Sequence, residues 1–392
     1  MKSEWKSSTI GSVCLVVTDG SHFSPQSVDN GEYMVSVKDF TAYGFDFSSC
    51  RRISIEDYEK LKGSGCVPEP EDILIGKDGA RYFEDIIIYR QPERPALLSS
   101  IAILRCDRNK ILPEFLYYIL RTPAFKHDVR DNYASGSAIP RIILKDFRRI
   151  PISYPSLEIQ EKIVSLLGAL DQRIQTNIKV NDNLLEQAQA LYKQYFPYRV
   201  DDNLPIDWRI GTVGEIIEIH DSKRIPLSGA ERAKMEKKTY PYYGAAALMD
   251  YVDDYIFDGK YLLLGEDGTV VDEAGYPILQ YVWGKFWVNN HAHILTGKLG
   301  FNVESLYMLF KQTPVKAIVT GAVQPKISQA NLRSIQVVIP PPKLLMDYNN
   351  QIDPLFTLLR TNEEANKSLA TLRDTLLPKL MSGEIDVTDI QL

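Results

Sequence analysis

Apolar side chains recur every seventh residue in two long stretches of the chain, one in the middle and one near the end. Two interleaved series run through each stretch. Their positions are Ile163, Leu170, Asn177, Leu184 and Leu191 with Leu167, Ile174, Asn181, Ala188 and Tyr195, then Tyr348, Leu355, Asn362, Leu369 and Leu376 with Ile352, Leu359, Asn366, Arg373 and Leu380. This spacing is typical of the contact seam of a coiled coil. It predicts two long paired helices, the first over about 157–195.

Asparagines interrupt both seams at matching places. Asn177 and Asn181 lie in the first seam, and Asn362 and Asn366 lie in the second. In an antiparallel pair of helices amide would face amide, whereas a slip of one turn would bury an amide against leucine. The asparagines are therefore predicted to fix the helix register. The alternative is that they are ordinary exposed helix residues.

The second stretch belongs to a copy of the first, displaced by 185 residues. Residues 135–142 read Ser-Gly-Ser-Ala-Ile-Pro-Arg-Ile and residues 320–327 read Thr-Gly-Ala-Val-Gln-Pro-Lys-Ile, so Pro140 corresponds to Pro325. A repeat of this length is far longer than a solenoid repeat and indicates two duplicated domain-plus-helix units.

Strand and helix patterns before each long helix predict two similar mixed domains. Apolar runs at 11–17, 73–76 and 100–105 predict strands, and residues 112–120 predict a helix. Residues 208–214, 262–268 and 303–310 echo parts of this order. The fold class is therefore α+β: two mixed α/β domains joined by two helices that form an antiparallel coiled coil. The predicted boundaries are 1–152, 153–200 for the central helix, 201–340, and 341–392 for the C-terminal helix.

Composition narrows the class of protein. The chain has 392 residues, 44% of them hydrophobic, and its longest apolar runs are too short to span a membrane. A polar start at residues 1–5 is no signal peptide, and four cysteines without a C-x-x-C motif are typical of a reduced protein, so a cytoplasmic location is expected. The net charge of −6 gives no global attraction to nucleic acid, so any such binding depends on local basic groups or on enclosing partners.

Sequence motifs of catalysis are absent. There is no P-loop, dinucleotide fingerprint, nucleophile elbow or aminomethyltransferase tetrapeptide. His291 and His293 offer two metal ligands on one strand face but no third at an obvious spacing, so no metal site is predicted. Glu71, Asp72 and Lys77 faintly resemble the acid–acid–lysine set of a nuclease, which the second copy lacks.

Two strands end in Gly-x-Asp-Gly, at residues 76–79 and 265–268. Such a turn exposes backbone N–H groups and places a side chain at a rim, although a purely structural turn explains it equally well. Basic, polar and aromatic loop residues near these turns are candidates for contacts with phosphates and base edges. The candidates are Ser21, His22, Lys38, Lys77, Asp78, Arg81, Arg141, Lys223, Arg224, Tyr242, Tyr243, Asp267, Gln324 and Lys326.

In this order, and occurring twice, these features resemble the DNA-specificity subunit of type I restriction–modification systems. The resemblance covers nearly the whole chain. It depends on residues 18–22, 72–79, 150–155 with 158–163, 241–245 and 377–385. The chain departs from the family pattern at Pro340-Pro341-Pro342, which puts the exact start of the C-terminal helix in doubt.

The resemblance implies two target-recognition domains that each read one half of a split double-stranded DNA site, with helices that set the spacer. It also implies two methyltransferase subunits docked on the helices and domains, and two motor–nuclease subunits. S-adenosylmethionine, ATP and magnesium would then be bound by those partners and not by this chain. The alternatives are a self-contained nuclease, and a coiled-coil DNA-binding regulator without methyltransferase partners.

Overall fold

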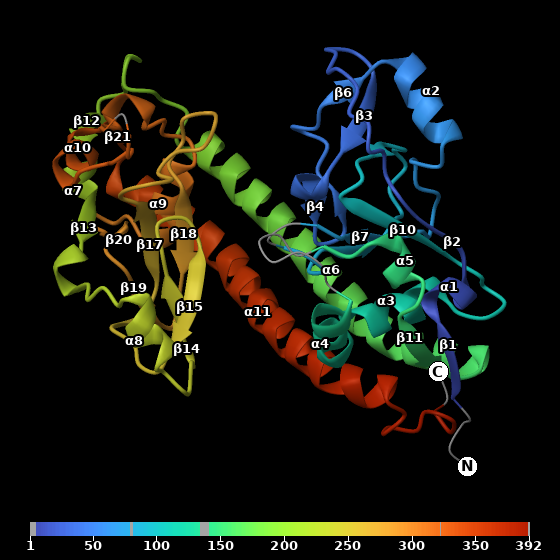
Figure 1. Ribbon diagram of the computed structural model, residues 1–392. Coiled ribbons are helices and arrows are strands. Elements are labelled where there is room, and N and C mark those ends of the chain that lie inside the picture. The colour runs from blue at the N-terminus through green and yellow to red at the C-terminus, as the bar shows by residue number, and fades with distance from the viewer. Residues whose placement is uncertain (1–4, 79–80, 134–140, 322, 391–392) are drawn as a thin grey trace. The chain divides into compact units, whose positions relative to one another are not determined.

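The computed structural model describes residues 5–78, 81–133, 141–321 and 323–390 (Figure 1). The chain forms two compact units. Unit 1 consists of Met1–Gln175 and Ala365–Leu392, and unit 2 consists of Thr176–Glu364. This division differs from the predicted boundaries, because each long helix contributes one half to each unit. Among the described residues, none of the helices has the length and apolar character needed to cross a membrane.

Each unit is built on a four-stranded antiparallel sheet with the same strand order. In unit 1 the order is β2-β10-β7-β8, with bounds Cys14–Asp19, Ile101–Cys106, Ile73–Gly76 and Ile86–Ile88. In unit 2 it is β13-β20-β17-β18, with bounds Ile217–Ile219, Ala292–Gly297, Tyr261–Gly265 and Leu279–Val282. The predicted strands at 73–76 and 262–265 are confirmed. Their unbroken aliphatic runs suit strands that are buried on both faces.

One predicted strand is wrong at its start. The run at 11–17 begins as a single helical turn, α1 (Ile10–Val13), and becomes β2 only at Cys14. Ile10 and Val13 stand three residues apart, so one helical turn buries both of them, which an extended strand would place on opposite faces. Unit 2 has the same turn in α7 (Val213–Ile216).

Each unit also carries a second sheet. The order is β6-β3-β9 in unit 1 and β15-β14-β19-β16 in unit 2. In both sheets the first strand along the chain, β3 or β14, pairs antiparallel with one neighbour and parallel with the other. The two outer sheets therefore share a local plan that no sequence echo revealed. The strands are β3 (Glu32–Val35), β6 (Arg52–Ile53), β9 (Ala96–Leu97), β14 (Tyr240–Tyr243), β15 (Leu248–Val252), β16 (Phe257–Asp258) and β19 (Lys285–Val288).

Short elements complete the units. A two-stranded sheet pairs the start of each domain with the strand before its long helix. These pairs are β1 (Lys6–Thr9) with β11 (Pro151–Tyr154), and β12 (Arg209–Thr212) with β21 (Gln336–Ile339). The remaining elements are β4 (Phe40–Thr41), β5 (Gly44–Phe45), η1 (Val37–Asp39), α2 (Ile55–Gly63), α3 (Pro113–Arg121), α4 (Pro123–Asn132), α5 (Leu144–Phe147), η2 (Asp221–Lys223), α8 (Gly229–Ala233), α9 (Val303–Phe310), η3 (Lys316–Ile318) and α10 (Gln329–Ser334).

The main core of unit 1 draws on both distant parts of the chain. Ile10 and Phe115 pack in one cluster with Ile163 of the central helix. Leu380 and Val387 from the last segment are buried in the same cluster. Unit 2 has a corresponding core around β17, β20 and α9, with a further cluster of Ala188, Met308, Tyr348, Ile352 and Phe356 along its helices.

Both predicted long helices are present as α6 (Leu157–Tyr195) and α11 (Pro342–Met381). In unit 2, Asn181 pairs with Asn362 and Tyr195 with Gln351, so the helices run antiparallel there. Pro342 stands at the first position of α11. A proline fits that position because no helix hydrogen bond is lost.

The predicted pairing of amide with amide is present in unit 2, whereas the role of the asparagines in fixing the register stays a prediction. Asn362 donates its side-chain amide to the Asn181 carbonyl oxygen at 2.8 Å, and the Asn181 amide donates to the Leu359 carbonyl at 3.3 Å. All four asparagines are buried, including Asn177 and Asn366, so the alternative of exposed helix residues is wrong. The aliphatic seam is shifted in places. Phe356 and Leu377 are buried where the sequence series predicts their neighbours Leu355 and Leu376.

Candidate functional site

Both units have a polar rim at the same edge of the four-stranded sheet. In each, the Gly-x-Asp turn after β7 or β17 pairs with the basic residue that follows the repeated proline. The bridges join Asp78 to Arg141 and Asp267 to Lys326. The amide after each basic residue donates to the turn, from Ile142 to the Lys77 carbonyl and from Ile327 to the Glu266 carbonyl. These matching contacts confirm that the predicted repeat is structural. Residues 79, 80 and 134–140, which include the first copy of the proline motif, lie outside the described residues.

Strand register extends the correspondence to the neighbouring loop. Ile101 pairs with Gly76 as Ala292 pairs with Gly265, so Ser100 and His291 stand in equivalent places. Asp19 lies opposite Ala102, and the register of β13 against β20 places Asp221 in the same position opposite His293. His22 and Arg224, three residues further on, both approach that aspartate at 3.4 Å. We call Asp19, His22, Lys77, Asp78, Ser100 and Arg141 rim 1, and Asp221, Arg224, Glu266, Asp267, His291 and Lys326 rim 2.

Rim 1 has a buried lysine at its centre. The Lys77 ammonium lies 3.3 Å from Asp19 and 3.4 Å from Asp78, and its side chain is only 9% exposed. A lysine held in this way neutralises two carboxylates and has little freedom to reach a phosphate group. Its predicted role as a direct phosphate contact therefore does not fit its position.

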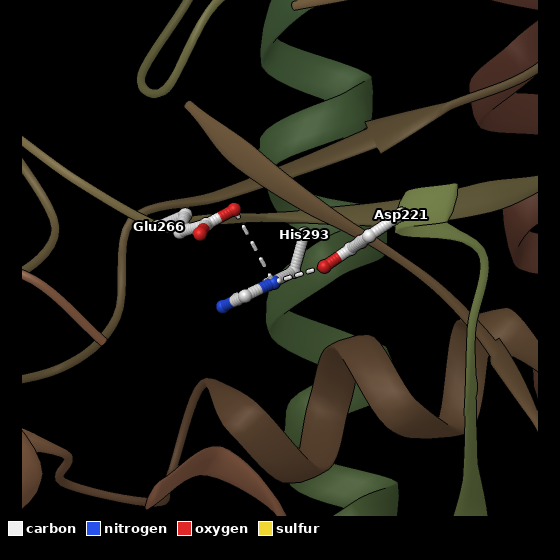
Figure 2. A group of neighbouring side chains, drawn as sticks. All are labelled: Asp221, Glu266 and His293. Carbon is white, nitrogen blue, oxygen red and sulfur yellow. Dashed lines mark hydrogen bonds and ion pairs between the residues drawn. The ribbon is translucent and has the colours of Figure 1, made fainter. Parts of the chain in front are cut away.

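Rim 2 has a buried cluster with an acid, Glu266, where rim 1 has a lysine (Figure 2). Arg224 bonds to Glu266 at 2.6 Å. Figure 2 shows His293 between the two acids, with its Nδ1 2.6 Å from Asp221 and 3.7 Å from Glu266. The His293 Nε2 contacts the Ile327 carbonyl at 2.8 Å. Both ring nitrogens of His293 therefore contact oxygen atoms inside the fold.

Asp221 is held ionised by this cluster. Burial alone raises the pKa of its carboxyl group, but the hydrogen bonds from His293 and the Ile294 amide outweigh burial. The pKa of Asp221 therefore lies below its ordinary value. Gln329 also donates to this carboxylate at 2.7 Å.

Asp221, Glu266 and His293 bring three potential metal ligands within 4.8 Å of one another. Their chemistry does not fit a cation. His293 contacts oxygen atoms through both ring nitrogens, and Arg224 fills the place beside the two carboxylates with a positive charge. Lys326 adds a second cation 3.3 Å from Glu266. The cluster is therefore an ion-pair network in which protein cations already face both carboxylates.

The sequence candidates fall into three groups by position. His22, Lys38, Arg81, Arg141, Lys223, Gln324 and Lys326 are exposed; Asp78, Arg224, Tyr243 and Asp267 are partly buried; Ser21, Lys77 and Tyr242 are buried. The predicted contact at Tyr242 is not supported, because its hydroxyl bonds to Leu227 and its ring is 1% exposed. Arg224 is likewise committed to internal partners, with a side chain that is 13% exposed. Arg81 bonds to Asp85 on the surface.

The acids of the nuclease-like set do not converge. Asp72 is 1% exposed and accepts two hydrogen bonds at 2.9 Å from Arg105. Lys77 stands at the other end of β7 and pairs with Asp19 instead. A nuclease centre needs its acids free to hold a cation near the lysine, so this arrangement does not support nuclease chemistry.

His291 is 43% exposed and its Nδ1 contacts Asp267, so it fits the surface or structural role that sequence reasoning preferred to metal binding. Sequence reasoning missed two positions beside the rims. Phe23 and Ile225 are exposed by 66% and 55%, directly after His22 and Arg224. The signal that would have found them is alignment of the two loops through the aspartates, which requires the strand register.

Comparisons with known proteins agree with this duplicated architecture. A family model described as the type I restriction modification DNA specificity domain matches residues 2–186 and again residues 205–369. The MjaIX specificity subunit of Methanocaldococcus jannaschii is 24% identical over 313 residues, which is 72% of this chain and 71% of that protein. The HindI specificity subunit of Haemophilus influenzae is 20% identical over 373 residues, covering 73% and 80%.

A solved structure has a similar fold. The crystal structure of the type I restriction-modification system S subunit from M. genitalium matches with a TM-score of 0.54 at 16% identity. The match covers 97% of this chain and 96% of that one. At this identity the likeness shows the fold alone.

Proposed function

The chain belongs to the family of type I restriction modification DNA specificity domains, and we propose that each of its two units reads one half of a divided DNA target. The family model matches twice, once for each predicted recognition domain. The observation that carries the proposal is the paired rim. The Asp78–Arg141 and Asp267–Lys326 bridges recur in the same place, while the side chains around them differ.

The differences between the rims suit two half-sites of different sequence. Phosphate contacts position a protein on DNA, whereas contacts to base edges specify the sequence. Arg141 and Lys326 are exposed, equivalent and basic, so they suit phosphate contact in both halves. Ser100 and His291 are equivalent but chemically different, so they suit discrimination between the halves.

Specificity subunits of this family recognise DNA and are not themselves catalysts. In the proposed complex, two methyltransferase subunits dock on this chain, and two motor–nuclease subunits join them. S-adenosylmethionine, ATP and magnesium belong to those partners.

The net charge of −6 supports a partner-dependent mode of binding, because a duplex is better retained when several subunits enclose it. A cytoplasmic complex agrees with the four unpaired cysteines.

The alternatives of a self-contained nuclease or an independent regulator gain no support. The family match describes a specificity domain, and the nuclease-like acids are bound within the fold.

Methylation sequencing of host DNA, with and without the gene, tests the proposal. We expect one split motif to lose its methyl groups when the gene is deleted. The informative variant exchanges residues 205–341 for the corresponding segment of a relative with a different target. Only the half-site read by unit 2 should then change.

Exchange of residues 5–155 is the matched control, because it should change only the other half-site. An unaltered methylation pattern on deletion, or a change in both halves on either exchange, contradicts the proposal. The expectation that helix length sets the spacer stays a prediction.

A further inference from the structure

An exposed apolar side chain follows the rim aspartate by four residues in both units. Phe23 follows Asp19, and Ile225 follows Asp221. Their exposed fractions are 66% and 55%. Single exposed apolar residues are common on protein surfaces and do not indicate a function by themselves. Exposure at equivalent places in two otherwise divergent loops indicates a function that both units share.

Two other exposed apolar residues, at the opposite ends of the sheets, lack such a counterpart. Leu15 is the extra residue of the β-bulge where β2 meets Cys106, so unit 2 has no equivalent. Leu299 is matched in unit 1 by Arg108, which stands the same number of residues after its strand. Duplication has therefore not preserved exposed apolar side chains in general.

Both side chains stand on a fixed backbone. The Ser21 hydroxyl donates to the Phe23 carbonyl at 2.6 Å and accepts from the Phe23 amide at 3.0 Å. The Trp287 indole donates to the Ile225 carbonyl at 2.6 Å. A Cβ atom at Gly20 would lie 2.3 Å from the Leu97 carbonyl oxygen, so the first loop approaches its neighbour closely. A recognition side chain gains from such anchoring, because less of its freedom is lost on binding.

Charged neighbours on each rim indicate what covers these side chains. Arg141 and Lys326 lie on the same rims, and Lys223 is exposed two residues before Ile225. The rim acids are mostly ion-paired inside the fold, with Lys77 in unit 1 and with Arg224 in unit 2. An apolar side chain beside the exposed cations that remain suits a duplex, where phosphates meet the cations and a thymine methyl group meets the apolar surface. A protein partner would more often cover a contiguous apolar patch.

Building on the proposed function, we propose that Phe23 and Ile225 are matched base-contacting residues, one for each half-site. Each packs against the C5-methyl group of a thymine in the major groove. Each contact then selects a thymine in the half-site of its own unit.

The test uses the full methyltransferase complex assembled on this chain and synthetic duplexes that carry its methylation motif. Thymines in the motif are replaced one at a time by uracil, which removes only the methyl group. For the wild-type complex, one replacement in each half-site should weaken binding about fourfold. Phe23→Ala should abolish sensitivity to one of these replacements, and Ile225→Ala should abolish sensitivity to the other.

Each variant is the control for the other, because the half-site read by the unaltered unit must keep its sensitivity. Leu15→Ala and Leu299→Ala, at the opposite ends of the sheets, should leave both sensitivities intact. Methylation sequencing gives a second readout, with Phe23→Ala and Ile225→Ala each relaxing one base pair of one half.

Three outcomes overturn the inference. Equal loss of affinity for all sequences in both variants assigns the side chains to non-specific contact. Normal DNA binding with loss of methyltransferase subunits assigns them to a protein interface. Unchanged recognition in both variants removes any role in reading the target. In each case a wild-type complex that still methylates a split motif keeps the proposed function intact.

Discussion

The two rims hold the same aspartate and surround it with opposite charges. In unit 1 Asp19 faces Lys77, whereas in unit 2 Asp221 shares its site with Glu266. The second acid is tolerated because Arg224 and Lys326 replace the missing cation and His293 hydrogen-bonds to Asp221. Between the two copies, the charged residues around the buried aspartate have therefore changed together, because a single exchange would leave an unpaired buried charge, which is costly.

Exchange of the central residue should break this balance in either unit. Lys77→Glu would bring a third carboxylate beside Asp19 and Asp78, and Glu266→Lys would bring a third cation beside Arg224 and Lys326. We expect each to lower the free energy of unfolding by about 3–5 kcal/mol. Hydrogen exchange of β7 and β17 amides, followed separately, measures the loss in each unit.

Two further variants sharpen the first prediction. Lys60→Glu changes the same charge at a side chain that is 65% exposed, and it should destabilise unit 1 far less. Adding Ala102→His and His22→Arg to Lys77→Glu copies the whole set of unit 2 and should recover part of the loss. If Lys77→Glu alone were as stable as the wild-type protein, the claim that the central residue and its partners must change together would be wrong.

Acid should weaken unit 2 through Asp221. Its folded pKa is depressed below the ordinary 3.8, so its stabilisation is present above that pH and is lost as the pH falls through the folded value. Asp221→Asn should flatten the pH dependence of unit 2 stability below about pH 4. Denaturation at pH 7 and in steps below pH 4 measures the change.

The exposed Asp207→Asn exchange is the control, because it removes an acid without touching the cluster. An acid sensitivity that persists in Asp221→Asn would assign it to another group.

The smallest effect on stability is expected at His291, the half-exposed histidine of rim 2. His291→Ser gives unit 2 the residue that unit 1 has at Ser100. Because His291 is 43% exposed, loss of its contact with Asp267 should change the free energy of unfolding by less than about 1 kcal/mol. Thermal unfolding measures this change, and methylation sequencing shows whether one position of a single half-site alters. A large loss of stability would mean that His291 belongs to the buried cluster.

Much of the architecture followed from periodicity and repetition. The heptads predicted both helices, and the asparagines predicted their own pairing, because a polar residue in an apolar seam has few acceptable partners. The exact seam was harder. An α-helix has 3.6 residues per turn, so a strict seven-residue count drifts, and Phe356 and Leu377 replace their predicted neighbours.

The rims were predicted only in part. The sequence made Asp78 and Arg141 candidates and the repeat aligned them with Asp267 and Lys326. Only the structure shows that the members of each pair bridge to each other. Arg224 was expected on the surface, since its partners Glu266 and the Ala292 carbonyl come from distant strands. Phe23 and Ile225 gave no signal, because their equivalence depends on a one-residue bulge that shifts the alignment of the loops. The shared plan of the outer sheets was hidden for a similar reason, since backbone pairing persists after side chains diverge.

The discontinuity of unit 1 has a consequence for biosynthesis. Its core includes Leu377, Leu380 and Val387, although most of its residues precede position 176. A ribosome therefore delivers every residue of unit 2 before it delivers the last contacts of unit 1. The half that is translated first is completed last, so a nascent chain exposes apolar surface of unit 1 until the final segment emerges.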